Sequence, residues 1–111
     1  MAETISFQEF QRLDLRVGRV VAVRDHPNAS KLYLMDVDLG PELGTRQLVA
    51  GLKPYMTAEA IQDRLVVVVA NLEPATLRGE RSEGMVLAAQ DGDNVVLLTT
   101  VDPVAPGSKV L

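Results

Sequence analysis

Residues 65–89 read LVVVVANLEPATLRGERSEGMVLAA and place a polar stretch, residues 71–84, between two apolar runs. The apolar runs, residues 65–70 and 85–89, have the length and the branched side chains of β-strands. A simple hairpin needs only about two to five residues between its strands, so this connection is long. Long polar connections between buried strands often carry binding residues.

Further strands are predicted on both sides of this stretch. The clearest is Lys31–Leu39, where apolar and acidic residues alternate as in a half-buried strand. We expect Tyr33, Met35, Val37 and Leu39 on one face, and Asp36 and Asp38 on the other. Gly18 predicts a bulge in the first strand. The complete set of predicted strands is Arg16–Arg24, Lys31–Leu39, Arg46–Ala50, Leu65–Ala70, Met85–Ala89 and Val95–Thr99.

Two short helices and a loop complete the prediction. Ser6–Leu13 has the spacing of a capping box, Ser6 with Glu9, and its apolar face is expected to cover one end of the sheet. Thr57 is expected to cap a second helix that ends near Ile61. Residues 40–44 are predicted to form a loop. Short strands with one brief helix between the third and fourth indicate an all-β chain, a five-stranded OB-fold barrel with terminal extensions.

Composition limits the class of protein. The 111 residues suffice for one domain, residues 1–111, with an aliphatic core, because aromatic residues make up only 4%. With no cysteine and one histidine, His26, the chain lacks the residues of a cysteine- or histidine-based metal site. The start of the chain lacks the pattern of a signal peptide, and no apolar run is long enough for a membrane span. We therefore expect a soluble, cytoplasmic protein with no membrane partner.

The residues offer little for catalysis. The sequence contains no pairing of a nucleophile with a base and no phosphate-binding P-loop ending, so we expect no enzyme and no cofactor. Asp36 and Asp38 could hold a cation, but paired acids on an exposed strand face are usually only solvated. The net charge of −4 argues against a generic nucleic-acid binder. Four arginines within residues 12–24 nevertheless leave room for a local basic face.

The polar stretch supplies the candidate binding residues. Asn71 can donate and accept hydrogen bonds, Arg78 presents a planar fork for phosphate, Ser82 can reach a phosphate oxygen, and Met85 offers an apolar contact. The alternative is that Asn71 and Ser82 only hold their own loop in place. Single-stranded nucleic acids usually stack on aromatic side chains, which are scarce here. Folded RNA is therefore the better candidate ligand.

Four motifs occur in one order: Asp14-Leu15-Arg16-Val17-Gly18, residues 26–32 (HPNASKL), Ala50-Gly51-Leu52, and the N-L-x-P-x-x-x-R-G-x-x-S-x-G-M pattern of residues 71–85. Together they resemble the tRNA-binding domain family. The resemblance covers about residues 5–110. It implies an OB fold, homodimerisation and binding of folded tRNA without reading its sequence.

The resemblance also implies which residues contact RNA. Carried over position by position, they are Lys31, Lys53, Asn71, Arg78, Ser82 and Met85. Arg46 is added because its predicted strand borders the same face. The family contains both free-standing proteins and the appended domain of methionyl-tRNA synthetase, so a synthetase is a further expected partner. The start at Met1 favours the free-standing form. The alternative function is that of the related CsaA export chaperones, which bind unfolded polypeptides.

Overall fold

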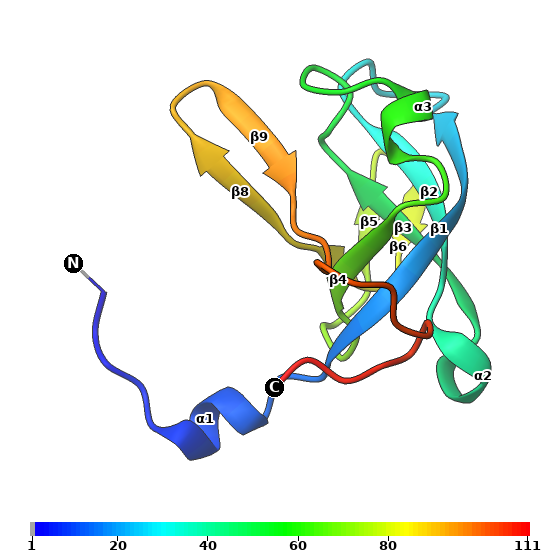
Figure 1. The fold of residues 1–111 in the computed structure, drawn as a ribbon. Helices are drawn as coiled ribbons and strands as arrows, with labels where there is room; N and C mark the ends of the chain where they lie inside the picture. Colours follow the sequence, from blue (N-terminus) through cyan, green and yellow to red (C-terminus); the bar gives the residue numbers. More distant parts are fainter. Residues whose placement is uncertain (1) are drawn as a thin grey trace.

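The computed structural model describes residues 2–111, which form a strand-rich barrel from which one helix and one hairpin project (Figure 1). The elements, in chain order, are α1 (Phe7–Gln11), β1 (Leu15–Asp25), β2 (Tyr33–Asp38), α2 (Gly40–Leu43), β3 (Thr45–Ala50), α3 (Ala58–Ile61), β4 (Leu65–Val69), β5 (Ala75–Leu77), β6 (Glu80–Ser82), β7 (Met85–Val86), β8 (Ala88–Asp91) and β9 (Asn94–Leu97).

The main sheet is antiparallel and has the strand order β3-β2-β1-β4-β7. The long strand β1 serves two neighbours, because its first part pairs with β4 and its second part with β2. The outer strands β3 and β7 contact each other, which nearly closes the sheet into a barrel. This arrangement confirms the predicted all-β, five-stranded OB-type barrel.

The core is aliphatic, and β2 contributes most clearly to it. Tyr33, Met35, Val37 and Leu39 are buried, whereas Asp36 and Asp38 are half-buried on the other face, so the predicted alternation is confirmed. β4 likewise has Val66 and Val68 fully buried in this core. The predicted cap of α3 is also confirmed, since the Thr57 hydroxyl accepts a hydrogen bond from the Ala60 amide.

The predicted bulge at Gly18 is wrong. The register of β1 against β2 shifts between Val20 and Ala22 instead. Gly18 lies where two strands approach closely, because a Cβ atom there would lie 2.5 Å from Val37 Cγ1 and 2.8 Å from Leu39 Cδ2. The glycine is thus required by packing and not by a change of register.

Two predicted boundaries also need correction. The expected loop of residues 40–44 contains the one-turn helix α2, with a proline in its first turn and its C-cap at Gly44. The expected strand Met85–Ala89 is divided at Leu87 into β7 and β8. The Leu87 amide still bonds to the Val67 carbonyl of β4, whereas its own carbonyl accepts from Leu98. Here the chain leaves the barrel and enters the separate β8–β9 hairpin (Figure 1).

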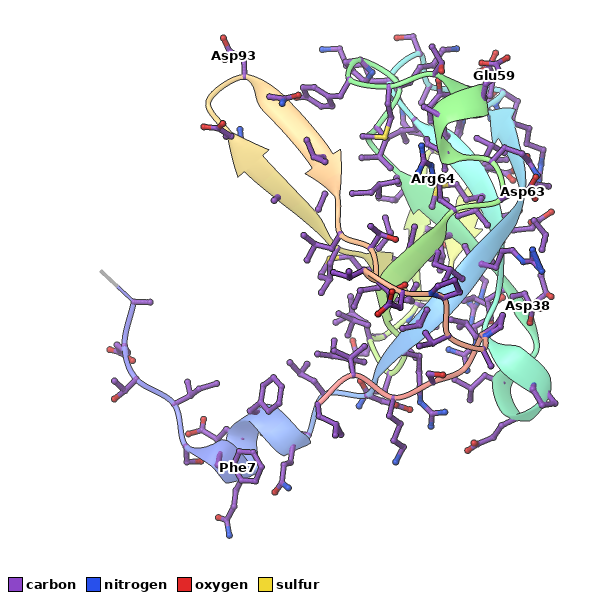
Figure 2. The ribbon with its side chains drawn as sticks, viewed as in Figure 1. Phe7, Asp38, Glu59, Asp63, Arg64 and Asp93 are labelled. Carbon is purple, nitrogen blue, oxygen red and sulfur yellow. The ribbon has the colours of Figure 1, made fainter. Side chains whose placement is uncertain are left out.

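Helix α1 forms as predicted but does not lie where it was expected. Ser6 and Glu9 make the complete capping box. The helix has no buried residue, and Phe7 is 71% exposed, so the prediction that α1 covers an end of the sheet is wrong. Figure 2 shows Phe7 pointing away from the barrel. A capping box fixes the start of a helix but carries no information on what the helix packs against.

None of the helices within residues 2–111 combines the length and apolar character needed to cross a membrane.

Candidate nucleic-acid interface

The polar stretch between β4 and β7 forms a small hairpin, β5–β6, which has its own two-stranded sheet. Leu77 pairs with Glu80, so the turn consists of Arg78 and Gly79 alone. Both have positive φ, 53° and 91°, the geometry of a type I′ turn. The side chain of Arg78 is exposed at the tip.

The tip of this hairpin lies against the turn between β1 and β2. His26 Nε2 lies 2.9 Å from the carbonyl oxygen of Leu77, and Asn28 Nδ2 lies 3.3 Å from that of Arg78. Lys31 is exposed in the same turn. The turn that carries Lys31 thus contacts the hairpin tip that carries Arg78, although the two segments are far apart in the sequence.

Lys53 lies near the same turn but is partly neutralised. Its Nζ is 3.0 Å from Asp25 Oδ1, at the end of β1. Both side chains are substantially exposed, so water and salt screen the pair. The ion pair therefore holds Lys53 only weakly.

Ser82 joins the hairpin to the barrel beside the seam, the place where the outer strands β3 and β7 contact each other. Its hydroxyl accepts a hydrogen bond from the Val49 amide and donates one to the Gly84 carbonyl, both at 3.0 Å. The Glu83 amide bonds to the Gln47 carbonyl beside it. The side chain is buried, so its hydrogen bonds in the free protein are to the protein's own backbone.

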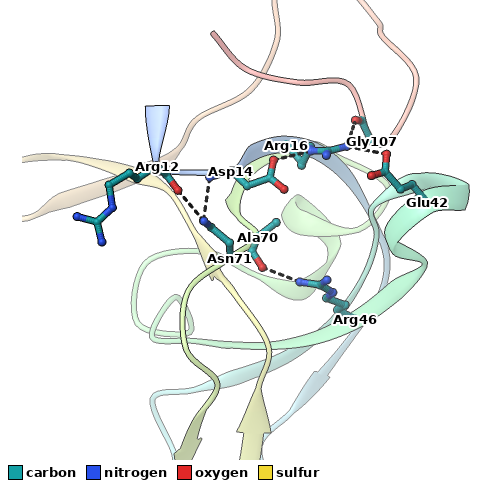
Figure 3. Close-up of polar contacts among 8 residues, drawn as sticks. All are labelled: Arg12, Asp14, Arg16, Glu42, Arg46, Ala70, Asn71 and Gly107. Carbon is teal, nitrogen blue, oxygen red and sulfur yellow. Dashed lines mark hydrogen bonds and ion pairs between the residues drawn. The ribbon is translucent and has the colours of Figure 1, made fainter. Parts of the chain in front are cut away.

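Asn71 and Arg46 make their contacts at the end of β4 (Figure 3). The side chain of Asn71 accepts from the Asp14 amide at 2.8 Å and donates to the Arg12 carbonyl at 2.7 Å. Arg46 Nη1 donates to the Ala70 carbonyl at 2.6 Å. Both side chains therefore hold the backbone around the end of β4.

Arg16, in the same region of Figure 3, fastens the C-terminal segment to β1. It is buried, and its guanidinium bonds to Asp14 at 2.6 Å and to the Gly107 carbonyl at 3.1 Å, with Glu42 at 3.5 Å. The hydrogen bond that Arg16 donates to the Asp14 carboxylate raises the pKa of Arg16 above its ordinary value. Arg16 is thus a permanently charged structural clamp and no candidate for ligand binding.

Met85 begins β7 and pairs with Val69 of β4. Met85 is 45% exposed, and Leu72, at the start of the polar stretch, is exposed to a similar extent. The predicted site residues therefore fall into two groups. Arg78 lies at the hairpin tip, and Lys31 and Lys53 lie on or near the β1–β2 turn that contacts it. Arg46, Asn71 and Met85 lie at the end of β4, and Ser82 joins the hairpin to β3.

The structure adds one candidate, Arg81, that the sequence analysis missed. Arg81 is exposed on β6, and Gln47 Nε2 holds its carbonyl at 2.9 Å. Arg24, by contrast, is engaged with Asp36 and Gln47. Within residues 2–111, no ion pair is found for Lys31, Arg78 or Arg81. Strict alternation along residues 80–82 could have indicated Arg81, because Ser82 and Glu80 point to the opposite face.

The protein offers little for metal or acid–base chemistry in the described part of the chain. No three or more His, Asp or Glu side chains within residues 2–111 gather as metal ligands would. Asp36 pairs with Arg24, and Asp38 accepts the Gly40 amide, so the two acids considered for a cation are engaged. A largely apolar cavity of about 370 Å³ lies between α3 and the β8–β9 hairpin, where Tyr55 and Val95 line it, and holds none of the predicted site residues.

Comparisons with known proteins agree with this geometry. A family model described as "Putative tRNA binding domain" matches residues 15–109. Methionine–tRNA ligase of Pyrococcus horikoshii is 54% identical over 108 residues, which make up 97% of this chain and 15% of the ligase. This chain thus spans only a small part of that enzyme's length.

Two solved structures share the fold over nearly the whole chain. The MetRS related protein from Pyrococcus horikoshii has a TM-score of 0.91 at 27% identity, covering 99% of this chain and 100% of that one. The CsaA chaperone protein from Picrophilus torridus has a TM-score of 0.90 at 30% identity, covering 97% and 100%.

A nearly closed five-stranded barrel with an exposed cationic hairpin beside a cationic turn defines an OB-type binding domain. Within that class, the chain belongs to the tRNA-binding domain family.

Proposed function

We propose that this chain is a non-catalytic module that binds folded tRNA as a homodimer in the cytoplasm. The observation that carries the proposal is the cluster of exposed cations, Lys31, Arg78 and Arg81, around the β5–β6 hairpin of a protein whose net charge is −4. A polyanion should approach an acidic protein only where such a cluster lies. Membership of the tRNA-binding domain family and the identity to methionine–tRNA ligases support the choice of tRNA.

The predicted site residues divide between contact and support. We assign direct phosphate contacts to Arg78 and Lys31, with Lys53 joining when RNA displaces Asp25. Ser82 supports the site, because its hydroxyl is engaged with the backbone of the seam. Asn71 and Arg46 do the same at the end of β4, and Met85 adds an exposed apolar contact there.

The aromatic residues favour folded RNA over single strands. Tyr33 is buried, and its hydroxyl donates to the Met56 carbonyl. Tyr55 is exposed and lines the cavity beside the β8–β9 hairpin. One exposed aromatic ring offers little of the successive base stacking on which single-strand binders depend.

Homodimerisation is proposed from the elements that leave the barrel. Helix α1 has five residues and no buried side chain, and such a short isolated helix is marginal in water. Ile5 and Phe7 expose 62% and 71% of their surface, and Val96 on β9 exposes 51%. A second copy of the chain would cover these apolar side chains. Sedimentation at micromolar concentration should give a dimer, and a monomer alone would refute this part.

A role without catalysis is proposed because the one histidine is occupied. Both ring nitrogens of His26 are within hydrogen-bond distance of backbone groups, so neither is available as a general base. Because the chain matches a segment of methionine–tRNA ligases, the module would then serve a synthetase by holding tRNA, either joined to it in one chain or as a separate protein.

The test is tRNA binding measured against salt concentration, with Arg78→Ala beside the matched control Arg19→Ala. Arg19 is also exposed but lies in the first half of β1, beside the C-terminal segment. Loss of one phosphate contact should lower the salt slope by about 1 for Arg78→Ala, whereas the control keeps the wild-type slope. A tRNA fragment without its folded corner should bind weakly. Absence of binding at low salt would refute the proposal.

A chaperone role is the second candidate, because the fold matches that of a CsaA chaperone protein and Met85, Leu72 and Leu77 are exposed around the hairpin. It predicts saturable binding of extended apolar peptides. Met85→Asp should abolish that binding, and peptide binding that survives this substitution would count against the candidate.

A further inference from the structure

His26 occupies an unusual position for the one histidine of the chain, because it is buried and both of its ring nitrogens are engaged. Nδ1 accepts a hydrogen bond from the Asn28 amide at 2.9 Å. A neutral imidazole has one donor and one acceptor nitrogen, so Nε2 carries the hydrogen. Nε2 therefore donates to the Leu77 carbonyl, 2.9 Å away.

Asn28 makes the companion contact. Its side-chain amide donates to the Arg78 carbonyl at 3.3 Å. The carbonyls of Leu77 and Arg78 belong to the two peptide groups that flank the Arg78 Cα atom. His26 and Asn28 thus hold the backbone on both sides of Arg78 from outside the hairpin.

Arg78 needs such support because of its backbone conformation. Its φ of 53° lies in the left-handed region, which Asn, Asp and Gly occupy readily and arginine does not. The residues of β5 are all exposed, and only β6 is fastened to the barrel, through Ser82 and the Arg81 carbonyl. The tip of a two-stranded hairpin gains little stability from the hairpin itself. A residue held in a sparsely populated conformation by its surroundings suggests function at that residue.

We propose that His26 and Asn28 are positioning residues that hold the Arg78 turn in the conformation that binds phosphate. The inference rests on the proposed RNA-binding function, which it extends from the contacting side chain to the groups that orient it. Without the two hydrogen bonds, the hairpin tip would move among several orientations, and binding would first have to select one.

Two substitutions of His26 separate its two hydrogen bonds. In His26→Gln the side-chain amide reaches as far as Nε2 and can still donate to the Leu77 carbonyl. In His26→Asn the shorter side chain can still accept the Asn28 amide, as in an Asx turn, but cannot reach Leu77. The glutamine variant should bind tRNA within about twofold of wild type, and the asparagine variant about tenfold more weakly.

The decisive measurement is the coupling between His26 and Arg78. If His26 acts by orienting Arg78, His26→Asn should change tRNA affinity by less than about twofold in an Arg78→Ala background. An equal loss in both backgrounds would overturn the inference, because it would mean that His26 acts on the fold as a whole. Equal affinities of the Gln and Asn variants would overturn it as well.

Ring nitrogen chemical shifts of His26 in the free protein provide a readout that needs no RNA. They should report the tautomer with hydrogen on Nε2, and backbone order parameters at Arg78 should fall in His26→Asn but not in His26→Gln. A different tautomer or unchanged order would refute the positioning role. Absence of tRNA binding by a wild-type protein with these signatures would refute the proposed function alone.

Discussion

Ser82 illustrates how a single hydroxyl can complete a barrel. β3 and β7 contact each other without being hydrogen-bonded neighbours in the sheet, and beside this contact the Val49 amide of β3 has the Ser82 hydroxyl as its acceptor. The same hydroxyl donates to the Gly84 carbonyl, so both of its hydrogen-bonding functions serve the backbone. The residue is 5% exposed, which makes each of these bonds costly to lose.

We therefore predict that Ser82→Ala lowers the free energy of unfolding by about 1–3 kcal/mol, because it leaves the Val49 amide without its acceptor. Urea denaturation measures this change. Ser30→Ala is the matched control, since Ser30 is exposed in the β1–β2 turn, and a shift within about 0.5 kcal/mol is expected there. Equal stability of the two variants would mean that the seam does not depend on the hydroxyl.

Gly18 is required for the packing of the barrel, because the side chains of Val37 and Leu39 leave no room for a Cβ atom at this position. A Cβ atom there would lie 2.5 Å from Val37 Cγ1, well inside van der Waals contact. Gly18→Ala should lower the free energy of unfolding by about 1–3 kcal/mol through overpacking. In Gly51→Ala the nearest atom would be Leu32 Cδ2 at 3.8 Å, so thermal or urea unfolding should barely change. A destabilised control with an unaffected Gly18→Ala would contradict this account.

At the scale of elements, the β5–β6 hairpin combines a strained turn with an exposed cation. Asn-Gly is the preferred sequence for a type I′ turn, whereas this hairpin has Arg78-Gly79. A left-handed conformation costs an ordinary residue roughly 1–2 kcal/mol. The turn would thus be more stable without its arginine, which is consistent with a residue retained for binding.

Arg78→Asn should accordingly stabilise the hairpin and weaken tRNA binding at the same time. Amide hydrogen exchange at the hairpin should slow by roughly fivefold, since about 1 kcal/mol of strain is relieved. Arg78→Lys is the control, because it keeps the charge and the strain, and its exchange should match wild type. Tighter tRNA binding by Arg78→Asn would contradict the assignment of Arg78 as a contact.

Local patterns predicted the elements more accurately than their placement. The alternation of Tyr33–Leu39 and the capping box of Ser6 with Glu9 depend on near neighbours, and both were confirmed. The division of Met85–Ala89 depends on Leu87 bonding to Val67 and Leu98, which are distant in sequence. The exposure of Phe7 depends on a fold that leaves α1 outside the barrel.

The candidate site shows the same difference between features that depend on near neighbours and features that depend on distant segments. Arg78 could be singled out by its residue type, and it lies exposed at a turn. The contacts of Asn71 with Arg12 and Asp14 could not be predicted, because they join segments nearly 60 residues apart in the chain. Sequence left two alternatives for Asn71, binding or support, and only its tertiary partners favour support.

At the scale of the whole molecule, the projecting elements would connect the proposed dimer with the proposed tRNA binding. The radius of gyration is 14.0 Å, against about 13 Å for a compact domain of this length, because α1 and the β8–β9 hairpin extend from the barrel (Figure 1). If two copies join through these elements, two cationic hairpins belong to one particle. A tRNA that touches both gains affinity without any new type of contact.

Phe7→Asp tests this connection, because it places a charge on the exposed face of α1 without altering any cation of the candidate site. We expect a monomer in sedimentation and a tRNA affinity lower by on the order of 10²-fold, as the second hairpin is lost. The salt slope should fall to about half, since one subunit neutralises about half of the phosphates.

Pro41→Asp is the control: it adds the same charge in the first turn of α2, on the other side of the barrel, and should leave both the dimer and the slope unchanged. A monomeric Phe7→Asp that binds tRNA with wild-type affinity and slope would show that one subunit suffices, and the two-hairpin model would then be wrong.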